Sequence, residues 1–358
     1  MQHRHRATLQ DIADALELSA NTVSRALSDK GGVSERTRML IRTEADRIGY
    51  IPNVHARSLV LGSRMMIGLV ITNPSNPFYA ELISEIELHA TAAGYTLVLL
   101  LSDESEEREE RAVETLIRSG VDAAIVVPVQ GRENPWVQLE RAGIPIVVVN
   151  RELEGMRCDF VGTDNEAGTY ATTTHVIEQG AKSVILLEED LPISTIRQRI
   201  AGFKRAMMDA RLPLTEQSVL AVPTRRNNRV VLPWQADEAY RLATDLLNRG
   251  HRPDAYVVGN DYFALGLFRA LRERELEVPH DTMVVGFGDY PFSEFLMPSL
   301  STVRLPARRV GRRAMQLLLA RVGGEPNAGF DSVTIAPELV IRESTRRCVH
   351  HLPRPQEQ

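Results

Sequence analysis

The stretch "LSANTVSRALSDK", from Leu18 to Lys30, combines a helix-start residue with one arginine and several short side chains. If it forms a helix, Val23, Ala26 and Leu27 fall at helical spacing and can pack inward. The side chains on the other faces stay available to touch another molecule; they are Ala20, Asn21, Ser24 and Arg25. The pattern predicts a short helix with one face for a core and another for recognition.

Residues 7 to 50 predict three short helices that hold this one in place. Thr8 with Asp11 fits a capping box, Ser19 can cap the second helix, and Ser34 can cap a third that stops at Gly49. The expected inward residues are Leu9, Ile12, Ala13 and Leu16 in the first helix and Leu40, Ile41, Ala45 and Ile48 in the third. The arrangement is a helix-turn-helix with a supporting helix.

From Met65 onward, short apolar runs alternate with helical patterns. The runs are "MIGLVIT", "YTLVLLL", "DAAIVVP", "IPIVVVN", "SVILLE", "DAYVVG" and "TMVVGF". The helical segments are 78–93, 107–119, 165–179, 198–210, 235–248 and 262–274. Continuous apolar runs are typical of parallel strands covered on both faces, so we expect two doubly wound α/β sheets. Loops at the carboxyl ends of such strands would line a ligand crevice.

The composition is that of an ordinary globular chain, with 43% hydrophobic and 25% charged residues. No run approaches the roughly 20 apolar residues that span a bilayer, and the charged N-terminus lacks a secretory signal, so we expect a cytoplasmic protein without membrane contact. Cys158 and Cys348 form no metal-type or redox pair. His350 and His351 with Cys348 could bind a metal, but a solvated chain end is the favoured interpretation, and we expect no metal or cofactor.

The net charge of −5 conceals an asymmetry along the chain. Residues 1–64 carry ten Lys and Arg against seven Asp and Glu, a net of +3, whereas the remainder carries 32 against 40, a net of −8. A basic N-terminal part favours an approach to phosphates.

Six motifs are spread over nearly the whole chain: "TLQDIADALELSANTVSRAL", "VSERTRMLIRTEADRIGYIPN", "ARSL", "GNDYFALG", "PSLSTVRLPARRVGRRA" and "LVIREST". Together they resemble the LacI/GalR family of bacterial repressors. This resemblance implies a DNA-binding headpiece (1–52), a hinge helix or linker (53–64), and a core (65–345) similar to periplasmic sugar-binding proteins, followed by a tail (346–358). The core would contain an N-subdomain at about 65–163 and 292–325 and a C-subdomain at about 164–291 and 326–345.

By this resemblance, "LSANTVSRALSDK" is the recognition helix, and Ala20, Asn21 and Arg25 read bases in the major groove. Arg25 can pair bidentately with guanine, Asn21 can pair with adenine or a phosphate, and Ala20 can touch a thymine methyl. Hydroxyl groups would contact phosphates and set the register; they are those of Thr8, Thr22, Ser24 and Ser34. The alternative is a plain three-helix domain with an exposed arginine.

The segment 53–61 matches the hinge helix of the family, and Leu59 matches the leucine that enters the minor groove from each protomer. Such a side chain unstacks a base step and bends the duplex. We expect this hinge to be mostly disordered in the free protein and to become ordered on the operator.

A small sugar or sugar-acid effector would bind between the two core subdomains, because the loops supply aromatic, amide, carboxylate and guanidinium groups. The expected effector-binding residues are Asn73, Phe78, Tyr79, Asn150, Arg197, Arg199, Trp234, Asn260, Asp261 and Asp289. Ordinary core packing is the alternative for the three aromatic residues, and helix capping is the alternative for Asn260 and Asp261.

Two positions depart from the family pattern. Asn150 and Gly288 stand where many relatives carry aspartate, and Arg151 lies next to the first. Both changes remove negative charge, so a sugar acid such as an aldonate becomes an alternative to a neutral sugar.

These features predict a transcription regulator whose affinity for a pseudo-palindromic operator is controlled by an allosteric effector. Release of DNA by an inducer is the default, with corepression as the alternative. A homodimer is expected because the polar tail after Thr345 has no leucine heptad. A solute-binding protein without a DNA-binding role is the main alternative, and residues 1–61 argue against it. An enzyme is disfavoured because no P-loop, complete dinucleotide fingerprint or "GxSxG" motif occurs.

Overall fold

The computed structural model describes residues 7–28, 31–50, 63–223, 234–324 and 329–346, with the backbone alone at positions 234 and 235. The chain divides into two compact units, Met1–Arg64 and Met65–Gln358. Each unit is described by itself.

The first unit contains helices α1 (Leu9–Ala15), α2 (Ala20–Leu27) and α3 (Glu35–Ile48). The three predicted caps are confirmed, because Thr8, Ser19 and Ser34 each accept a hydrogen bond from a backbone N–H in the first turn of their helix. Gly49 ends α3 in the left-handed region at φ 67°. A small core joins the helices; it contains Ile12, Ala13, Val23, Ala26, Ile41 and Ala45.

One inward residue predicted for α3 is wrong. Leu40 is 54% exposed, whereas Ile41 and Ala45 are buried and Ile48 packs against them. The buried positions lie four residues and then three residues apart, so they share one face of the helix. Leu40 is one position earlier, and one position rotates a side chain by about 100° around a helix. The neighbouring Met39 is also exposed.

The second unit contains two six-stranded sheets. The first has the order β11-β5-β4-β3-β1-β2 and the second has the order β12-β10-β9-β8-β6-β7. The strands of the first are β1 (Met66–Ile71), β2 (Thr96–Leu101), β3 (Ala123–Val126), β4 (Ile146–Val149), β5 (Asp159–Thr163) and β11 (Ser332–Ile335). Those of the second are β6 (Val184–Glu189), β7 (Val219–Val222), β8 (Ala255–Val258), β9 (Met283–Gly288), β10 (Ser301–Arg304) and β12 (Glu338–Val340). All pairings are parallel except that of β10 with β12.

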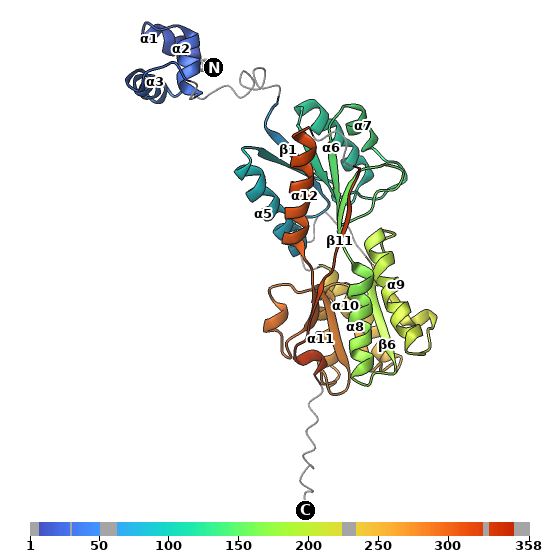
Figure 1. Cartoon of the computed structure of the whole chain (residues 1–358). Coiled ribbons are helices and arrows are strands. Elements are labelled where there is room, and N and C mark those ends of the chain that lie inside the picture. Colours follow the sequence, from blue (N-terminus) through green and yellow to red (C-terminus); the bar gives the residue numbers. More distant parts are fainter. Residues whose placement is uncertain (1–6, 29–30, 51–62, 224–233, 325–328, 347–358) are drawn as a thin grey trace, which may run out of the picture. The chain divides into compact units, whose positions relative to one another are not determined.

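Helices cover both faces of each sheet, which explains why the strands are continuous apolar runs (Figure 1). On the first sheet, α5 (Pro77–Ala92) and α12 (Ala307–Val322) share one core, and α6 (Glu106–Ser119) and α7 (Val137–Arg141) pack on the other. On the second sheet, α10 (Trp234–Asn248) and α11 (Asp261–Arg272) share one core, and α8 (Asn165–Glu178) and α9 (Ser194–Asp209) share the other. We call these two layered bodies the first lobe and the second lobe. The predicted fold class is confirmed.

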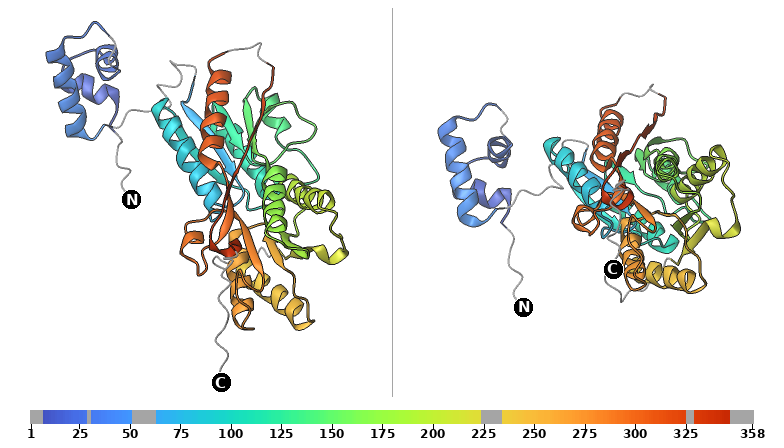
Figure 2. Two further views of the ribbon diagram at one scale, coloured as in Figure 1. Left: turned by 60° about the horizontal axis from the view of Figure 1, so that its bottom comes forward. Right: turned by 90° about the horizontal axis from the view of Figure 1, so that it is seen from below.

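The chain passes between the lobes three times: from β5 to α8, from β10 to α12, and from β11 to β12. Figure 2 shows the orange and red segments running from one lobe to the other. The expected subdomain boundaries at 292 and 326 differ from this pattern. Strand β10 pairs with β9 and stays in the second lobe, and β11 pairs with β5 and stays in the first. Strands β10 and β11 have only four residues each, of which three and two, respectively, are polar, so neither contains the continuous apolar run on which the strand predictions depended.

Candidate functional site

Helix α2 presents the predicted base-reading residues as the sequence implied. Val23 and Ala26 are fully buried, Asn21 and Arg25 are exposed, and Ala20 is half-buried. The guanidinium of Arg25 donates a hydrogen bond from Nη2 to the carbonyl oxygen of Gly31. The loop after α2 therefore holds Arg25 in place in the absence of DNA, and a base contact would have to replace this bond.

Two of the four predicted phosphate-contacting hydroxyls, those of Thr8 and Ser34, act as helix caps. Thr8 Oγ1 donates to Asp11 Oδ2 at 2.8 Å and accepts from the Asp11 backbone N–H at 3.3 Å. The hydroxyls of Ser19 and Thr22 lie 2.8 Å apart, and Ser34 Oγ accepts from the Thr37 N–H at 3.2 Å. These contacts fix the helix N-termini, whose N–H groups can also bind phosphate. Ser24 is half-buried on α2, and phosphate contact by these groups stays a prediction.

The side chains of two predicted site residues lie outside the part of the chain that the structure describes. Leu59 falls in the segment 51–62, and the side chain of Trp234 is not described. The minor-groove contact expected of Leu59 and the effector contact expected of Trp234 therefore stay predictions, and so does the alternative that the 348–351 cluster binds a metal. In the described part of the chain, no group of three or more His, Cys, Asp or Glu side chains could hold a metal ion.

A cavity of about 330 Å³ opens where the two lobes meet. Its wall includes two predicted effector-binding residues, Phe78 at the start of α5 and Asp289 after β9. The other lining residues are Pro77, Glu81, Gly288, Tyr290, Pro291, Arg304, Leu305, Pro306, Ala307, Arg308 and Arg309. A cavity of this size fits the range for small-molecule sites.

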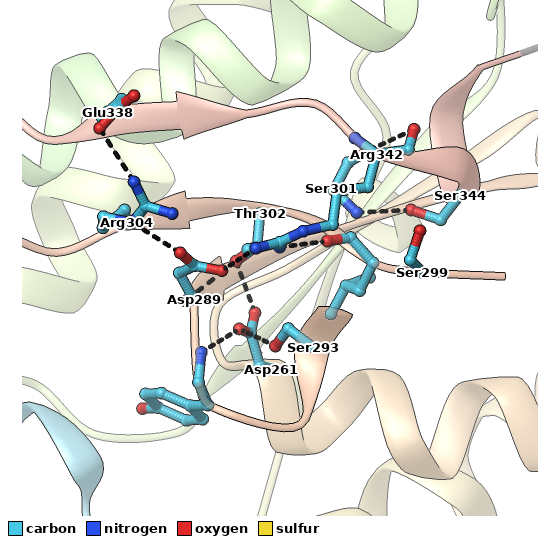
Figure 3. A network of polar contacts seen from close by, with 12 residues as sticks. Asp261, Asp289, Ser293, Ser299, Ser301, Thr302, Arg304, Glu338, Arg342 and Ser344 are labelled. Carbon is cyan, nitrogen blue, oxygen red and sulfur yellow. Dashed lines mark hydrogen bonds and ion pairs between the residues drawn. The ribbon is translucent and has the colours of Figure 1, made fainter. Parts of the chain in front are cut away.

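Asp261 and Asp289 belong to a polar network that joins the loop after β9, strand β10 and the segment after β12 (Figure 3). Asp261 is fully buried, and its carboxylate accepts hydrogen bonds from the Tyr290 N–H at 3.0 Å, Ser293 Oγ at 2.7 Å and Thr302 Oγ1 at 2.7 Å. Asp289 pairs with Arg304 and with Arg342, each at 2.7 Å. Asp261 therefore ties the loop after β9 to strand β10, and Asp289 ties β10 to the segment after β12.

Other predicted residues also have structural partners. Asn260 caps α11 by accepting from the Tyr262 N–H at 2.9 Å, so the capping alternative is confirmed for it. Asn73 accepts from the Ser75 N–H at 2.9 Å. Asn150 donates to the hydroxyl of Tyr79, a buried residue, at 3.2 Å.

The predicted arginines differ in environment. The Arg197 side chain is 55% exposed and lies 3.7 Å from Glu154, an exposed pair of little energetic weight. Arg199 is buried and bidentate, with Nε 2.7 Å and Nη2 3.0 Å from the two carboxylate oxygens of Glu188. Burial alone would lower the pKa of Arg199, but the paired carboxylate of Glu188 outweighs it and the pKa is raised.

The first lobe contains a matching pair. Arg151 is buried and bidentate to Glu104, with Nη1 2.7 Å from Oε2, and it also donates to the Pro128 carbonyl at 3.2 Å. Sequence reasoning named Arg151 but missed Glu104 and Glu188. The sequence does not show which arginine pairs with these glutamates, because Glu104 lies 47 residues from Arg151 and Glu188 lies 11 residues from Arg199.

Direct hydrogen bonds connect the lobes. Ser194 at the start of α9 donates its N–H to Gln130 Oε1 at 2.8 Å, and Gln130 Nε2 donates to Ser194 Oγ at 3.1 Å. Gln198 Nε2 donates to Glu152 Oε1 at 2.8 Å. Tyr290 of the second lobe donates its hydroxyl to Asn76 Oδ1 of the first at 3.1 Å. None of Gln130, Ser194 or Asn76 was predicted.

A three-helix headpiece with an exposed second helix, joined in one chain to a two-lobed parallel α/β core, defines a helix-turn-helix regulator with a ligand-binding body. Residues 8–53 match the model for bacterial regulatory proteins of the lacI family, and residues 173–345 match a periplasmic binding protein-like domain. The chain belongs to the lacI family of bacterial regulatory proteins. It is a DNA-binding transcription regulator with an effector-binding core, in a family of regulators rather than enzymes.

Curated relatives and solved structures agree with this assignment. The HTH-type transcriptional repressor PurR of Vibrio parahaemolyticus is 30% identical over 344 residues, which cover 95% of this chain and 99% of the relative. PurR of Haemophilus influenzae is 29% identical over 343 residues, with the same coverage. The fold is similar to that of the lac repressor dimer bound to operator and the anti-inducer ONPF (TM-score 0.81, 24% identity, 95% of this chain and 99% of that one). It is also similar to the CelR–cellobiose complex (TM-score 0.69, 25% identity, 95% and 100%). Within the described residues, no helix has the length and apolar character needed to cross a membrane.

Proposed function

We propose that this protein is a repressor that acts in the cytoplasm as a homodimer on a pseudo-palindromic operator. The observation that carries the proposal is helix α2, whose buried face and serine cap fix it in the headpiece while Asn21 and Arg25 remain exposed. Two such helices related by a two-fold axis would read the two half-sites of an inverted repeat.

Arg25 would read a guanine, Asn21 an adenine or a phosphate, and Ala20 a thymine methyl. The hydroxyls at the helix N-termini and on α2 would contact phosphates, and Leu59 from each protomer would enter the minor groove of the bent duplex. The lac repressor, which shares the fold, is described as a dimer bound to operator, which supports the same assembly here.

We propose that a small sugar binds between the lobes and changes operator affinity. The interlobe cavity and the similarity to a cellobiose-binding regulator support a sugar-type ligand. A sugar acid is disfavoured, because Glu188 occupies the fork of Arg199 and Glu104 occupies the fork of Arg151. Ligand binding would favour one relative orientation of the lobes, and reciprocal coupling to DNA is typically about 1–3 kcal/mol.

The test is selection of binding sites from random duplexes, followed by titration of the selected site and a scrambled duplex by fluorescence anisotropy. We expect an inverted repeat, preferred by about 10³-fold or more, with affinity that falls steeply as salt rises. Equal affinity for selected and scrambled DNA at moderate ionic strength would contradict the proposal. Titration in the presence of sugars then shows whether the effector releases the operator, which we expect, or strengthens binding.

A further inference from the structure

Positive charge gathers on one wall of the interlobe cavity. Arg304, at the end of β10, and Arg308 and Arg309, in the first turn of α12, all line it. The carboxylates that line the same cavity are those of Glu81 and Asp289. Among the described lining residues, guanidinium groups therefore outnumber carboxylates by three to two.

The three arginines differ in how firmly they are held. Arg304 pairs with Asp289 at 2.7 Å (Figure 3). Arg308 lies 3.8 Å from Glu81, and both side chains are more than half exposed, so this pair contributes little to stability. Arg309 is exposed, and its guanidinium forms no hydrogen bond or ion pair with any described residue. Arg308 and Arg309 are therefore available to a ligand.

These two arginines also lie where the helix itself does not favour them. The start of a helix carries partial positive charge, so acidic side chains stabilise its first turn and basic side chains oppose it. Helix α12 has no acidic residue in its first turn, and Pro306 before it supplies no side-chain cap. A local arrangement that opposes stability in this way is typical of a functional site, and here a bound anion would offset the positive charge.

The rest of the cavity suits a sugar ring. Phe78 from the first lobe and Tyr290 from the second supply aromatic side chains. Glu81 and Asp289 carry carboxylates that can accept hydrogen bonds from hydroxyl groups. A ligand in this cavity would touch both lobes where the chain crosses from β10 to α12, so it could bias their relative orientation.

We infer that the effector held in this cavity is a sugar phosphate, whose phosphoryl group is bound by Arg308 and Arg309 at the start of α12. This inference rests on the proposed function and names the chemical class of its effector. A phosphate monoester carries a charge of about −1.5 to −2 near pH 7 and can accept hydrogen bonds from two guanidinium groups at once. A carboxylate carries a single charge and is satisfied by one arginine. Because the phosphoryl group binds at α12, Arg151 and Arg199 keep their glutamate partners.

The test uses the full-length protein and matched ligands with gluco, galacto and manno configurations, at constant ionic strength. Each set contains the hexose 6-phosphate, the parent hexose and the uronate, in which a carboxylate replaces the 6-hydroxymethyl group. Binding is followed by scanning calorimetry and titration calorimetry at pH 7.5. We expect at least one hexose 6-phosphate to raise the melting temperature, because a ligand that binds the folded state stabilises it. Its parent hexose, its uronate and inorganic phosphate should each bind at least about 10-fold more weakly.

Two variants with opposite expected effects test the charges. Arg309→Gln should weaken binding of the hexose phosphate by about 10-fold or more and leave binding of the parent hexose nearly unchanged. Glu81→Gln should strengthen it by about twofold or more, because a negative charge is removed beside the phosphoryl group. The matched control is Arg141→Gln, since Arg141 is exposed at the end of α7, on the opposite face of the first sheet from α12.

The ligand-free proteins provide a second criterion. Arg309→Gln removes a cation from the start of a helix, so without ligand it should melt at or above the temperature of the wild type. Weaker binding of the hexose phosphate then cannot be ascribed to a damaged fold.

Each outcome decides the inference. It is overturned if a hexose, a uronate or inorganic phosphate binds as tightly as the hexose phosphate, or if no hexose phosphate in the three sets stabilises the protein. It is also overturned if Arg309→Gln and Arg141→Gln bind the hexose phosphate equally well, or if Glu81→Gln weakens binding as much as Arg309→Gln does. The proposed function survives these results if the operator is still bound specifically. Conversely, loss of operator preference contradicts the proposed function even where a hexose phosphate binds through Arg309.

Discussion

Gln130 and Ser194 form a reciprocal pair of hydrogen bonds across the two lobes. The amide oxygen of Gln130 accepts from the Ser194 N–H at 2.8 Å, and its nitrogen donates to Ser194 Oγ at 3.1 Å. The same amide nitrogen also donates to the Glu152 carbonyl at 2.6 Å. One side chain therefore connects the loop after β3, the loop after β4 and the start of α9.

We expect Gln130→Ala to favour separation of the lobes. The change removes three hydrogen bonds and leaves the Ser194 N–H without its acceptor, so the free energy of unfolding should fall by about 1–3 kcal/mol in urea titrations. Effector affinity should also fall, because a smaller fraction of molecules has the lobes in the binding orientation. Gln217→Ala, at an exposed position, serves as the control. Unchanged stability and unchanged effector affinity in Gln130→Ala would rule out a role for this contact.

Arg25→Ala should reduce operator affinity by about 1–3 kcal/mol and relax the base preference at one position of each half-site. Its affinity for a scrambled duplex should change much less, since phosphate contacts dominate there. Anisotropy titrations with single-base variants of the selected operator measure both effects. Circular dichroism controls for folding, because the side chain is exposed and its bond to the Gly31 carbonyl is local. An equal loss on operator and scrambled DNA would assign Arg25 to phosphate contact.

Because the pKa of Glu109 is raised, the free energy of unfolding should decline as the pH rises. Glu109 is buried on α6, and burial raises its pKa to about 7 although its Oε1 accepts from the Val129 N–H at 2.7 Å. Between the ordinary pKa near 4.5 and 7, the folded protein therefore binds more protons than the unfolded chain at this site. Stability should then fall as pH rises through this window, and Glu189 acts in the same direction.

Urea titrations at pH 5, 6, 7 and 8 measure this dependence. Glu109→Gln should make the curve flatter, because the amide oxygen can still accept from Val129 but cannot ionise. Glu114→Gln, an exposed change on the same helix, should leave the curve unaltered. Identical slopes for the wild type and Glu109→Gln would contradict a raised pKa at this site.

Asp261→Ala should destabilise the second unit strongly. The change leaves two buried hydroxyls and one N–H without their acceptor in β10 and the loop after β9, and loss of a buried charged partner of this kind typically costs about 3–5 kcal/mol. Scanning calorimetry should show a lower melting temperature for residues 65–346 and an unchanged transition for the headpiece. Because Asp261 is also a predicted effector residue, calorimetric titration of the folded variant separates the two roles. A variant of normal stability that fails to bind effector would favour direct ligand contact.

The elements with strong local signals could be predicted from sequence. Thr8 with Asp11, Ser19 and Ser34 mark helix starts by side chains that bond within three residues, so their effect is local. Long apolar runs such as that of β1 can also be recognised as strands from the sequence alone. The strands β5, β7, β10, β11 and β12 were not predicted; all five are short, and all except β7 carry polar residues. Neighbouring strands hold them in the sheets, and that contribution lies far away in sequence.

The site was less predictable than the fold. Arg199 was among the predicted effector-binding residues, but the sequence did not reveal that Glu188 occupies its guanidinium. The two departures at Asn150 and Gly288 suggested a loss of negative charge, whereas Glu104 after β2 and Glu188 and Glu189 at the end of β6 carry carboxylates that this reasoning did not count. The electrostatic character of an interlobe site depends on groups from several strand ends, and their sum appears only when the fold brings them together.

The late crossings of the chain bear on how the protein is made. Helix α12 and strand β11 complete the core and the edge of the first lobe, yet they come from residues 307–335. A ribosome that has released the first five strands has not yet supplied Ala307, Val310, Ala314 or Leu318, so the nascent first lobe keeps an uncovered apolar face until these residues emerge. The lobe whose strands are translated first therefore cannot complete its core before most of the second lobe has been made.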